Sequence, residues 1–331
     1  MGSTSSNQNN TFYLQNGDTN KKRSLKSNII EIKSIKSFES IKCIKQICCE
    51  YKCLCRIAFS SQLRQFIVTD CEDNMLKIFD FHGNFIKSLN PSLVLKCPWA
   101  IYVNNKSNEI FVADGKLGRI FVFDTEFKHL RDFGNIDLVE CITIDENDNN
   151  SAKKHQNYEP TLYAADYRND LVTMWNSKTG AFKKQFGIDS PADIAVDDCK
   201  IFITSDNSFK FLPNTRKLDY LKGENCIFVL DKFNYNIMNK IRFNNWLSPN
   251  CIHFDKENNH LATIAFDIDD ELNVSKTRFL YIIDKDTFTC LYKINLNVDK
   301  TSDMCIVESE GDIRALISRG PFKPGICLIE F

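Results

Sequence analysis

The chain has 331 residues, with 42 lysines and arginines against 43 aspartates and glutamates, and 43% of its residues are hydrophobic. An apolar fraction of this size excludes a wholly disordered chain, and no apolar run is long enough to predict a membrane-spanning helix. The net charge of −1 argues against a nucleic-acid-binding protein.

The charge is unevenly distributed along the chain. Residues 1–52 carry nine basic and four acidic residues, a net of +5, which leaves −6 for the remainder of the chain. Residues 1–27 are poor in apolar side chains, and we expect them to form a disordered arm. The sequence therefore predicts a basic arm attached to an acidic folded body.

The N-terminus matches a lipidation motif. Gly2 follows Met1, and Ser6 provides the hydroxyl group of the N-myristoylation motif. A single acyl chain binds a membrane only marginally, so a second signal is needed, and basic residues attract an anionic lipid surface. The arm supplies four of them: Lys21, Lys22, Arg23 and Lys26. Because no apolar signal sequence is present, we expect a cytoplasmic protein with peripheral membrane attachment; the alternative is a polar terminus without a lipid.

The fourteen cysteines do not indicate a disulfide scaffold, because the chain is long and no secretory signal is recognisable. Five of them are clustered: Cys43, Cys48, Cys49, Cys53 and Cys55. The segment has no C-x2-C pair and no histidine, which weakens a zinc interpretation. We expect a cysteine-rich linker over residues 39–52, thiols that pack as small apolar side chains, and no metal or cofactor.

Short strands repeat in a fixed pattern through the body. A strand ending in aspartate is followed by a loop and a second strand, whose last residue lies ten positions after that aspartate. The pairs are Asp70 and Asp80, Asp114 and Asp124, and Asp166 and Asn176. A further short apolar run precedes each pair, and a fourth run follows it after a turn. Each unit therefore reads as four short strands.

Six such units are predicted, and the last one ends the chain after three strands, which leaves an unpaired sheet edge. Residues 28–38 alternate as a strand does, and we expect them to supply the missing strand and close the ring. Six four-stranded antiparallel sheets around an axis form an all-β, six-bladed β-propeller, which we expect to be monomeric. The approximate unit bounds are 53–90, 98–134, 141–187, 191–243, 249–296 and 303–331.

These units resemble the NHL-repeat family of six-bladed propellers. The resemblance lies in the strand–Asp–loop–strand–Asp pattern, in prolines such as Pro98 before inner strands, and in the Phe186-Gly187 pair that ends an outer strand. It covers residues 28–331 and is clearest over 53–205. A WD40-type propeller is the alternative, because Trp175 and the turn after it resemble that repeat, although no Gly-His dipeptide occurs.

Two long loops on adjacent units are the predicted binding surface. Residues 206–226 are basic and aromatic, and residues 267–278 are acidic. Long loops concentrate function, so we expect a rim that binds a protein partner; solvated insertions are the plainer alternative. The predicted rim residues are Phe209, Lys210, Phe211, Arg216, Lys217, Tyr220, Asp269 and Asp270.

Catalytic chemistry has little support in the sequence. Asp70, Asp114, Asp166 and Asp206 hold equivalent places, which favours turn capping over a metal ring. A metal-dependent hydrolase or lyase of propeller type would need carboxylates and histidines converging from several inner strands, and His253 alone is placed to do so. No G-x-S-x-G, H-E-x-x-H or phosphate-binding motif occurs. The prediction is a non-catalytic interaction scaffold without a nucleic-acid partner, and the metal-dependent enzyme is the alternative.

Overall fold

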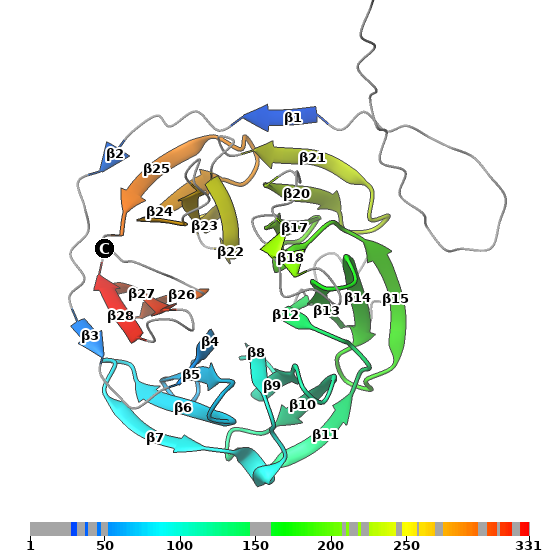
Figure 1. Cartoon of the computed structure of the whole chain (residues 1–331), viewed down its shortest axis with the longest axis vertical. Helices are drawn as coiled ribbons and strands as arrows, with labels where there is room; N and C mark the ends of the chain where they lie inside the picture. Colours follow the sequence, from blue (N-terminus) through cyan, green and yellow to red (C-terminus); the bar gives the residue numbers. More distant parts are fainter. Residues whose placement is uncertain are drawn as a thin grey trace, which may run out of the picture.

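The computed structural model is built almost entirely from short β-strands (Figure 1). It describes residues 28–31, 37–38, 45–47, 52–145, 160–206, 210–211, 218–219, 225–242, 247–256, 258–268, 274–296, 303–309, 312–319 and 325–330. The helical content of these ranges is one 3-10 turn, Pro91–Leu93. Nothing in them could cross a membrane as a helix, since no helix is both long and apolar enough.

The first three sheets are each built from four consecutive strands. The first contains β4 (Leu54–Ser60), β5 (Gln65–Asp70), β6 (Met75–Asp80) and β7 (Phe85–Leu89). The second contains β8 (Pro98–Asn104), β9 (Glu109–Asp114), β10 (Arg119–Phe123) and β11 (His129–Phe133). The third contains β12 (Val139–Asp145), β13 (Thr161–Asp166), β14 (Leu171–Asn176) and β15 (Phe182–Gly187).

The other three sheets follow in chain order. The fourth contains β16 (Pro191–Val196), β17 (Lys200–Ser205), β20 (Cys226–Asp231) and β21 (Ile237–Arg242). The fifth contains β22 (Leu247–Asp255), β23 (His260–Ile268), β24 (Val274–Asp284) and β25 (Cys290–Asn295). The last contains β26 (Asp303–Ser309), β27 (Asp312–Arg319) and β28 (Gly325–Glu330). A short hairpin, β18 (Lys210–Phe211) with β19 (Leu218–Asp219), lies between β17 and β20.

The sheets are arranged around a central axis, with the first strand of each innermost and the fourth outermost (Figure 1). This is an all-β β-propeller with four-stranded antiparallel blades. Five blades take all four antiparallel strands from one continuous segment of the chain. The sequence predicted six blades, of which five are shown in this form; the last sheet has three strands of its own, the number predicted for the last unit.

The N-terminal strands correct the predicted closing strand. β1 (Asn28–Glu31) pairs in parallel with β21, and β2 (Ser37–Phe38) pairs in parallel with β25. The strand that pairs with β28 is β3 (Lys45–Ile47), in antiparallel register. The prediction that residues 28–38 complete the last sheet was therefore wrong, and the expected linker 39–52 contains the strand that does so. The physical reason is that the outer edges of the fourth and fifth sheets present unpaired backbone groups along the path of this segment.

Apolar clusters between neighbouring sheets form the core. In the first five sheets the described residues of the middle strands are mostly buried, which explains their continuous apolar runs. In β5, for example, Phe66, Ile67 and Val68 are fully buried. One cluster lies between each successive pair of sheets, and another joins the first sheet to Val307 of β26. The inner strands also contact one another in order, including β26 with β4.

Buried ion pairs repeat across two of these interfaces. Lys232 Nζ, just after β20, lies 2.8 Å from Asp145 Oδ2 at the end of β12. In the next interface Lys285 Nζ, just after β24, lies 2.8 Å from Asp197 Oδ2, just after β16. The two lysines hold equivalent positions in successive sheets. Each therefore ties its own blade to the inner strand of the preceding one.

The aspartates that end the second strands cap the loops, as predicted, at three of the four expected positions. Asp114 is fully buried; its Oδ1 accepts the backbone N–H groups of Lys116 and Leu117, and its Oδ2 those of Lys96 and Cys97. Asp70 and Asp166 accept comparable bonds. In the fourth sheet the residue in this register is Ser205, one position before the predicted Asp206, and its hydroxyl donates to the Asp189 carbonyl.

Replacing Asp114 should be costly. Asp114→Ala removes the charged acceptor of four part-buried backbone hydrogen bonds, and bonds to a charged group contribute about 1.5–3 kcal/mol each, so we expect a loss of at least about 3 kcal/mol. Asp124→Ala is the matched control, because Asp124 caps an exposed turn with two such bonds and should lose about 1 kcal/mol. Urea unfolding measures both. Equal losses in the two variants would contradict the capping role.

Candidate functional site

The inner strands share an irregularity that turns side chains toward the axis. In β8, β12, β16 and β22 the register with the second strand shifts by one residue near the strand's start, and β4 has the corresponding shift between Leu54 and Ile57. A β-bulge of this kind leaves a residue unpaired and redirects its side chain. The residues in the bulges are Cys55, Arg56, Trp99, Glu140, Ala192 and Asn250. Repetition of one local feature therefore assembles a common centre.

Arg56 occupies this centre and is only 6% exposed. Its Nε donates to the Glu140 carbonyl oxygen at 2.9 Å, and its Nη2 donates to the Ala192 carbonyl oxygen at 2.7 Å. Its Nη1 lies 3.4 Å from Asp193 Oδ2 and 3.2 Å from Asp303 Oδ1. All three guanidinium nitrogens thus bond to inner strands of other sheets: β12, β16 and β26.

The two carboxylates extend the network to further strands. Asp303 Oδ2 accepts the Ile57 N–H of β4 at 2.8 Å. Asp193 Oδ2 accepts the Ile252 N–H of β22 at 2.9 Å, and its Oδ1 accepts its neighbour's N–H. Because every carboxylate oxygen already has a donor, the pair is held in a fixed geometry.

Glu140 and Trp99 bring in the remaining inner strand. The Trp99 indole Nε1 of β8 donates to Glu140 Oε2 at 3.1 Å. Burial is the main reason that the pKa of Glu140 is raised, and the Arg56 charge opposes that shift. We call Arg56, Trp99, Glu140, Asp193 and Asp303 the axial network. With the backbone groups that they bind, these side chains connect all six inner strands.

One cation faces three acids in this network. Burial raises the pKa of Asp303 to about 6, with a further rise from the nearby Asp193 charge, while Arg56 lowers it. A buried carboxylate whose charge is only partly compensated holds its proton more tightly. The axis is therefore sensitive to mildly acidic pH.

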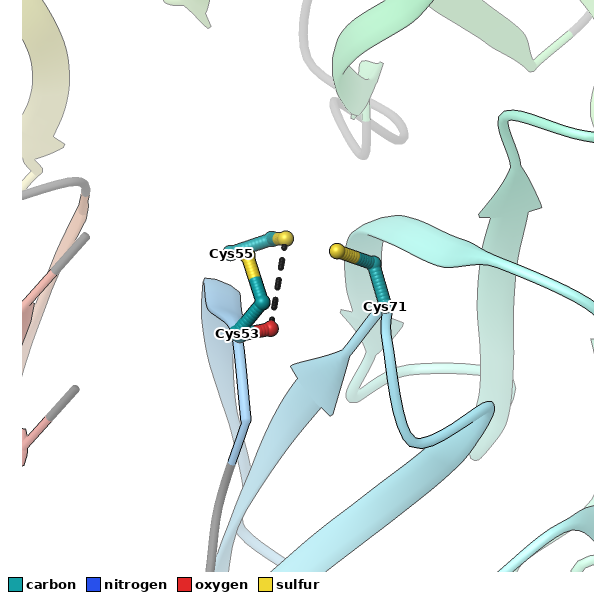
Figure 2. A group of neighbouring side chains, drawn as sticks. All are labelled: Cys53, Cys55 and Cys71. Atoms are coloured by element: carbon teal, nitrogen blue, oxygen red, sulfur yellow. Dashed lines mark hydrogen bonds between the residues drawn. The ribbon is translucent and has the colours of Figure 1, made fainter. Parts of the chain in front are cut away.

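A second cluster lies beside the axial network and consists of thiols (Figure 2). Cys53 immediately precedes β4, Cys55 lies in the β4 bulge, and Cys71 immediately follows β5. Their sulfur atoms all lie within 4.8 Å of one another, and all three residues are buried. The side chains of Cys97, just before β8, and Trp99 pack against them. We call Cys53, Cys55, Cys71 and Cys97 the thiol cluster.

The thiols of this cluster perturb one another. Figure 2 shows the sulfurs of Cys55 and Cys71 turned toward each other, with the Cys55 thiol donating to the Cys53 carbonyl oxygen at 3.6 Å. Hydrogen bonds from Cys55 and Cys71 lower the pKa of Cys53 to about 4. The same interactions raise the pKa of Cys55 and of Cys71.

The predicted site residues are not brought together by the described part of the chain. Lys210 and Phe211 form β18, which pairs with β19, and only their backbone is described. The other rim residues, Phe209, Arg216, Lys217, Tyr220, Asp269 and Asp270, lie outside the described residues, as do Gly2, Lys21, Lys22, Arg23 and Lys26. His253 lies in β22, and burial lowers its pKa, which keeps the imidazole neutral at pH 7.

Sequence reasoning missed both centres. For the axial network the available signal was a charged residue near the start of an otherwise apolar inner strand, as with Arg56, Asp193 and Asp303. For the thiol cluster, Cys53 and Cys55 were noticed, but Cys71 and Cys97 were not connected with them. The cysteines come together in space because Cys53 and Cys97 precede adjacent inner strands at equivalent positions.

Comparison with known proteins supports the architecture alone. No protein-family model matches the chain, and no curated protein matches it in sequence. Among solved structures, the hydrazine synthase of Kuenenia stuttgartiensis is similar, with a TM-score of 0.56 at 11% identity over 83% of this chain and 78% of that one. A match at this identity shows a shared propeller fold and nothing about activity.

Removing the axial cation should destabilise the fold. Arg56→Met leaves two carboxylates buried without their cation, and breaking a buried pair in this way costs about 3–5 kcal/mol. Asp193→Asn and Asp303→Asn added to that variant should recover much of the loss, because the uncompensated charges are gone. Arg168→Met is the control, since Arg168 and Asp137 form an exposed pair that contributes at most about 1 kcal/mol. A loss no larger for Arg56→Met than for Arg168→Met contradicts this account.

Asp303 should also give stability a pH dependence of unusual sign. Its pKa is about 6 in the folded chain, against about 3.9 for an unfolded aspartate. The folded state binds the proton more tightly between those values, so this group's contribution to stability is present below about pH 4 and is lost as pH rises to about 6. Urea unfolding of the wild type and Asp303→Asn across this range isolates the effect. The stability difference between the two proteins should change with pH, and a constant difference would refute it.

Proposed function

We propose that the chain is a non-catalytic interaction scaffold whose propeller holds binding loops in place. The observation that carries the proposal is Arg56, whose three guanidinium nitrogens bond to other sheets at the position where propeller channels can hold a ligand. A side chain committed to joining strands is not free to bind a substrate. The surfaces left for function are the loops and edges of the blades.

The alternative, a metal-dependent hydrolase or lyase, receives partial support from the convergence of Glu140, Asp193 and Asp303. Such an enzyme needs carboxylates that can bind a metal ion and a water molecule. Here the Arg56 guanidinium group contacts both Asp193 and Asp303, and backbone N–H groups donate hydrogen bonds to the carboxylate oxygens of both. A fixed cation repels a second one, so the scaffold is the better supported of the two functions.

The proposed ring has six blades and is closed by β3. Support comes from the pairing of β3 with β28 and from the apolar cluster that joins Val307 to the first sheet. The arrangement agrees with the NHL-type resemblance of the sequence, and membership of that family is part of this proposal. Closure in this way removes the edge that a three-stranded last sheet would leave unpaired.

The proposed partner surface is the rim formed by the two long loops. The hairpin β18–β19 lies in the first loop, and β23 and β24 continue their pairing as far as Ile268 and Val274 at the second. Basic and aromatic residues on one loop and acidic residues on the other suit a protein partner with charges of both signs.

The basic arm is proposed to place the propeller at a membrane. An acyl group on Gly2 and the positive charges of Lys21, Lys22, Arg23 and Lys26 provide the two signals that stable attachment requires. The arm precedes β1 on the outer edge of the fourth sheet. The proposed protein is a peripheral, cytoplasmic adaptor.

A charge-reversal experiment tests the rim. The rim variant carries Lys210→Glu, Arg216→Glu and Lys217→Glu; its control carries Lys106→Glu, Lys128→Glu and Lys178→Glu, with the same charge change in exposed turns between other strands. Cross-linking in cells and quantitative mass spectrometry should recover partners with the wild type and the control. The amount of these partners recovered with the rim variant should fall at least about tenfold, because complementary charges set the rate of encounter and the specificity.

Two outcomes would count against the scaffold. Equal partner profiles in all three proteins would remove the rim as the binding surface, and metal-dependent hydrolysis abolished by Glu140→Gln would establish the enzyme instead. Fractionation of the same cells reports on the arm. Gly2→Ala should release the protein from membranes, and a native N-terminal peptide without the acyl mass would end the lipid proposal.

A further inference from the structure

We propose that Cys53, Cys55, Cys71 and Cys97 bind one zinc ion, or another thiophilic divalent cation, as a four-thiolate structural site. The inference does not depend on the proposed scaffold function. It rests on the convergence of the Cys53, Cys55 and Cys71 sulfurs from the start of β4 and the end of β5, with Cys97 at the start of β8 packed against them.

The sulfur positions fit the metal. Zinc–sulfur bonds of about 2.3 Å in a tetrahedron place sulfurs roughly 3.8 Å apart. The sulfurs of Cys53, Cys55 and Cys71 lie within 4.8 Å of one another, so a contraction of about 1 Å or less brings them to the metal distance. Cys97 packs against these residues, and the Cys71 thiol interacts with the other three. Cys97 is therefore the candidate for the fourth ligand, and its sulfur has to move toward the other three to complete the shell.

The composition of the cluster distinguishes it from ordinary buried cysteines. Cys226, Cys251 and Cys290 each lie in a cluster dominated by aliphatic and aromatic side chains. Among the described residues, the side chains packed in the thiol cluster are the four cysteines and Trp99, with no aliphatic side chain. Thiols that merely fill space have no reason to gather with one another.

The backbone around the cluster is fixed by hydrogen bonds. Cys53 donates its N–H to Asp70 Oδ1 and accepts the Cys71 N–H. Cys97 donates its N–H to Asp114 Oδ2 and accepts the Gly115 N–H. The capping aspartates thus hold the chain on which three of the four ligands stand. Support of this kind beyond the ligands themselves is what orients a metal site.

A metal here would join the first two blades at their inner edge. Four protein ligands complete the tetrahedral shell of zinc and leave no open position for a substrate, so the site is structural rather than catalytic. Cys53 also directly precedes the inner strand β4. The metal would therefore fix the point where the chain enters the first blade.

Cobalt titration of the reduced, chelator-treated full chain tests the site. The wild type should bind one equivalent of Co²⁺ with the intense visible and near-ultraviolet absorption of tetrahedral thiolate coordination, and Zn²⁺ should displace it. Cys71→Ser should weaken binding by at least about 100-fold, because even second-shell losses cost 10–100-fold. Cys290→Ser is the matched control, a buried cysteine of another cluster, and should bind as the wild type does.

Thermal unfolding is the second readout. Zn²⁺ should raise the midpoint for the wild type and Cys290→Ser but not for Cys71→Ser, since a ligand stabilises the state that binds it. Circular dichroism of Cys71→Ser and Cys97→Ser confirms that each variant is folded. Binding without a thiolate spectrum, four thiols that react freely in the presence of Zn²⁺, or a disulfide within the cluster in protein isolated without added reductant or oxidant would each overturn the proposal.

Discussion

The fold depends on one shared positive charge at its axis. Arg56 reaches from β4 to β12, β16 and β26, and the carboxylates that it binds hold backbone N–H groups of β4 and β22. A propeller brings its inner strands so close together that bulky aliphatic side chains have little room. A planar guanidinium with donors in several directions satisfies many acceptors in that space. The cost of burying the charge is offset only because the surrounding groups are complete in their hydrogen bonding.

Three members of the axial network, Arg56, Trp99 and Glu140, lie in the bulge that five inner strands share. In each of these sheets the bulge directly follows a residue of the inner strand that pairs with the second strand near its end. In the second sheet, for example, Pro98 pairs with the capping Asp114 just before the bulge. The capping aspartate and the inward-facing residue are therefore two results of one local conformation. The conformation of the capped loop and the position of the bulge side chain are consequently coupled. A substitution that removes the cap also shifts the side chain that points toward the axis.

Much of the architecture could be predicted from the sequence, because period and spacing are local properties. The pairs Asp70–Asp80 and Asp114–Asp124 revealed the unit, and its strands form as expected. Which strand would reach β28 could not be predicted, since residues 28–31 and 45–47 both suit a strand and the choice depends on edges elsewhere in the ring. The axial network and thiol cluster were missed for a related reason: their members are far apart in sequence, and only the closeness of neighbouring inner strands unites them.

The two centres meet in a single bulge. Cys55 and Arg56 are adjacent there, one facing the thiols and the other the axis. A metal bound at the thiols would restrict the backbone on which Arg56 stands, so both centres would hold the same strand from opposite sides. Support from both sides fixes the start of β4, and a rigid support lowers the conformational entropy that any binding event at the ring would cost.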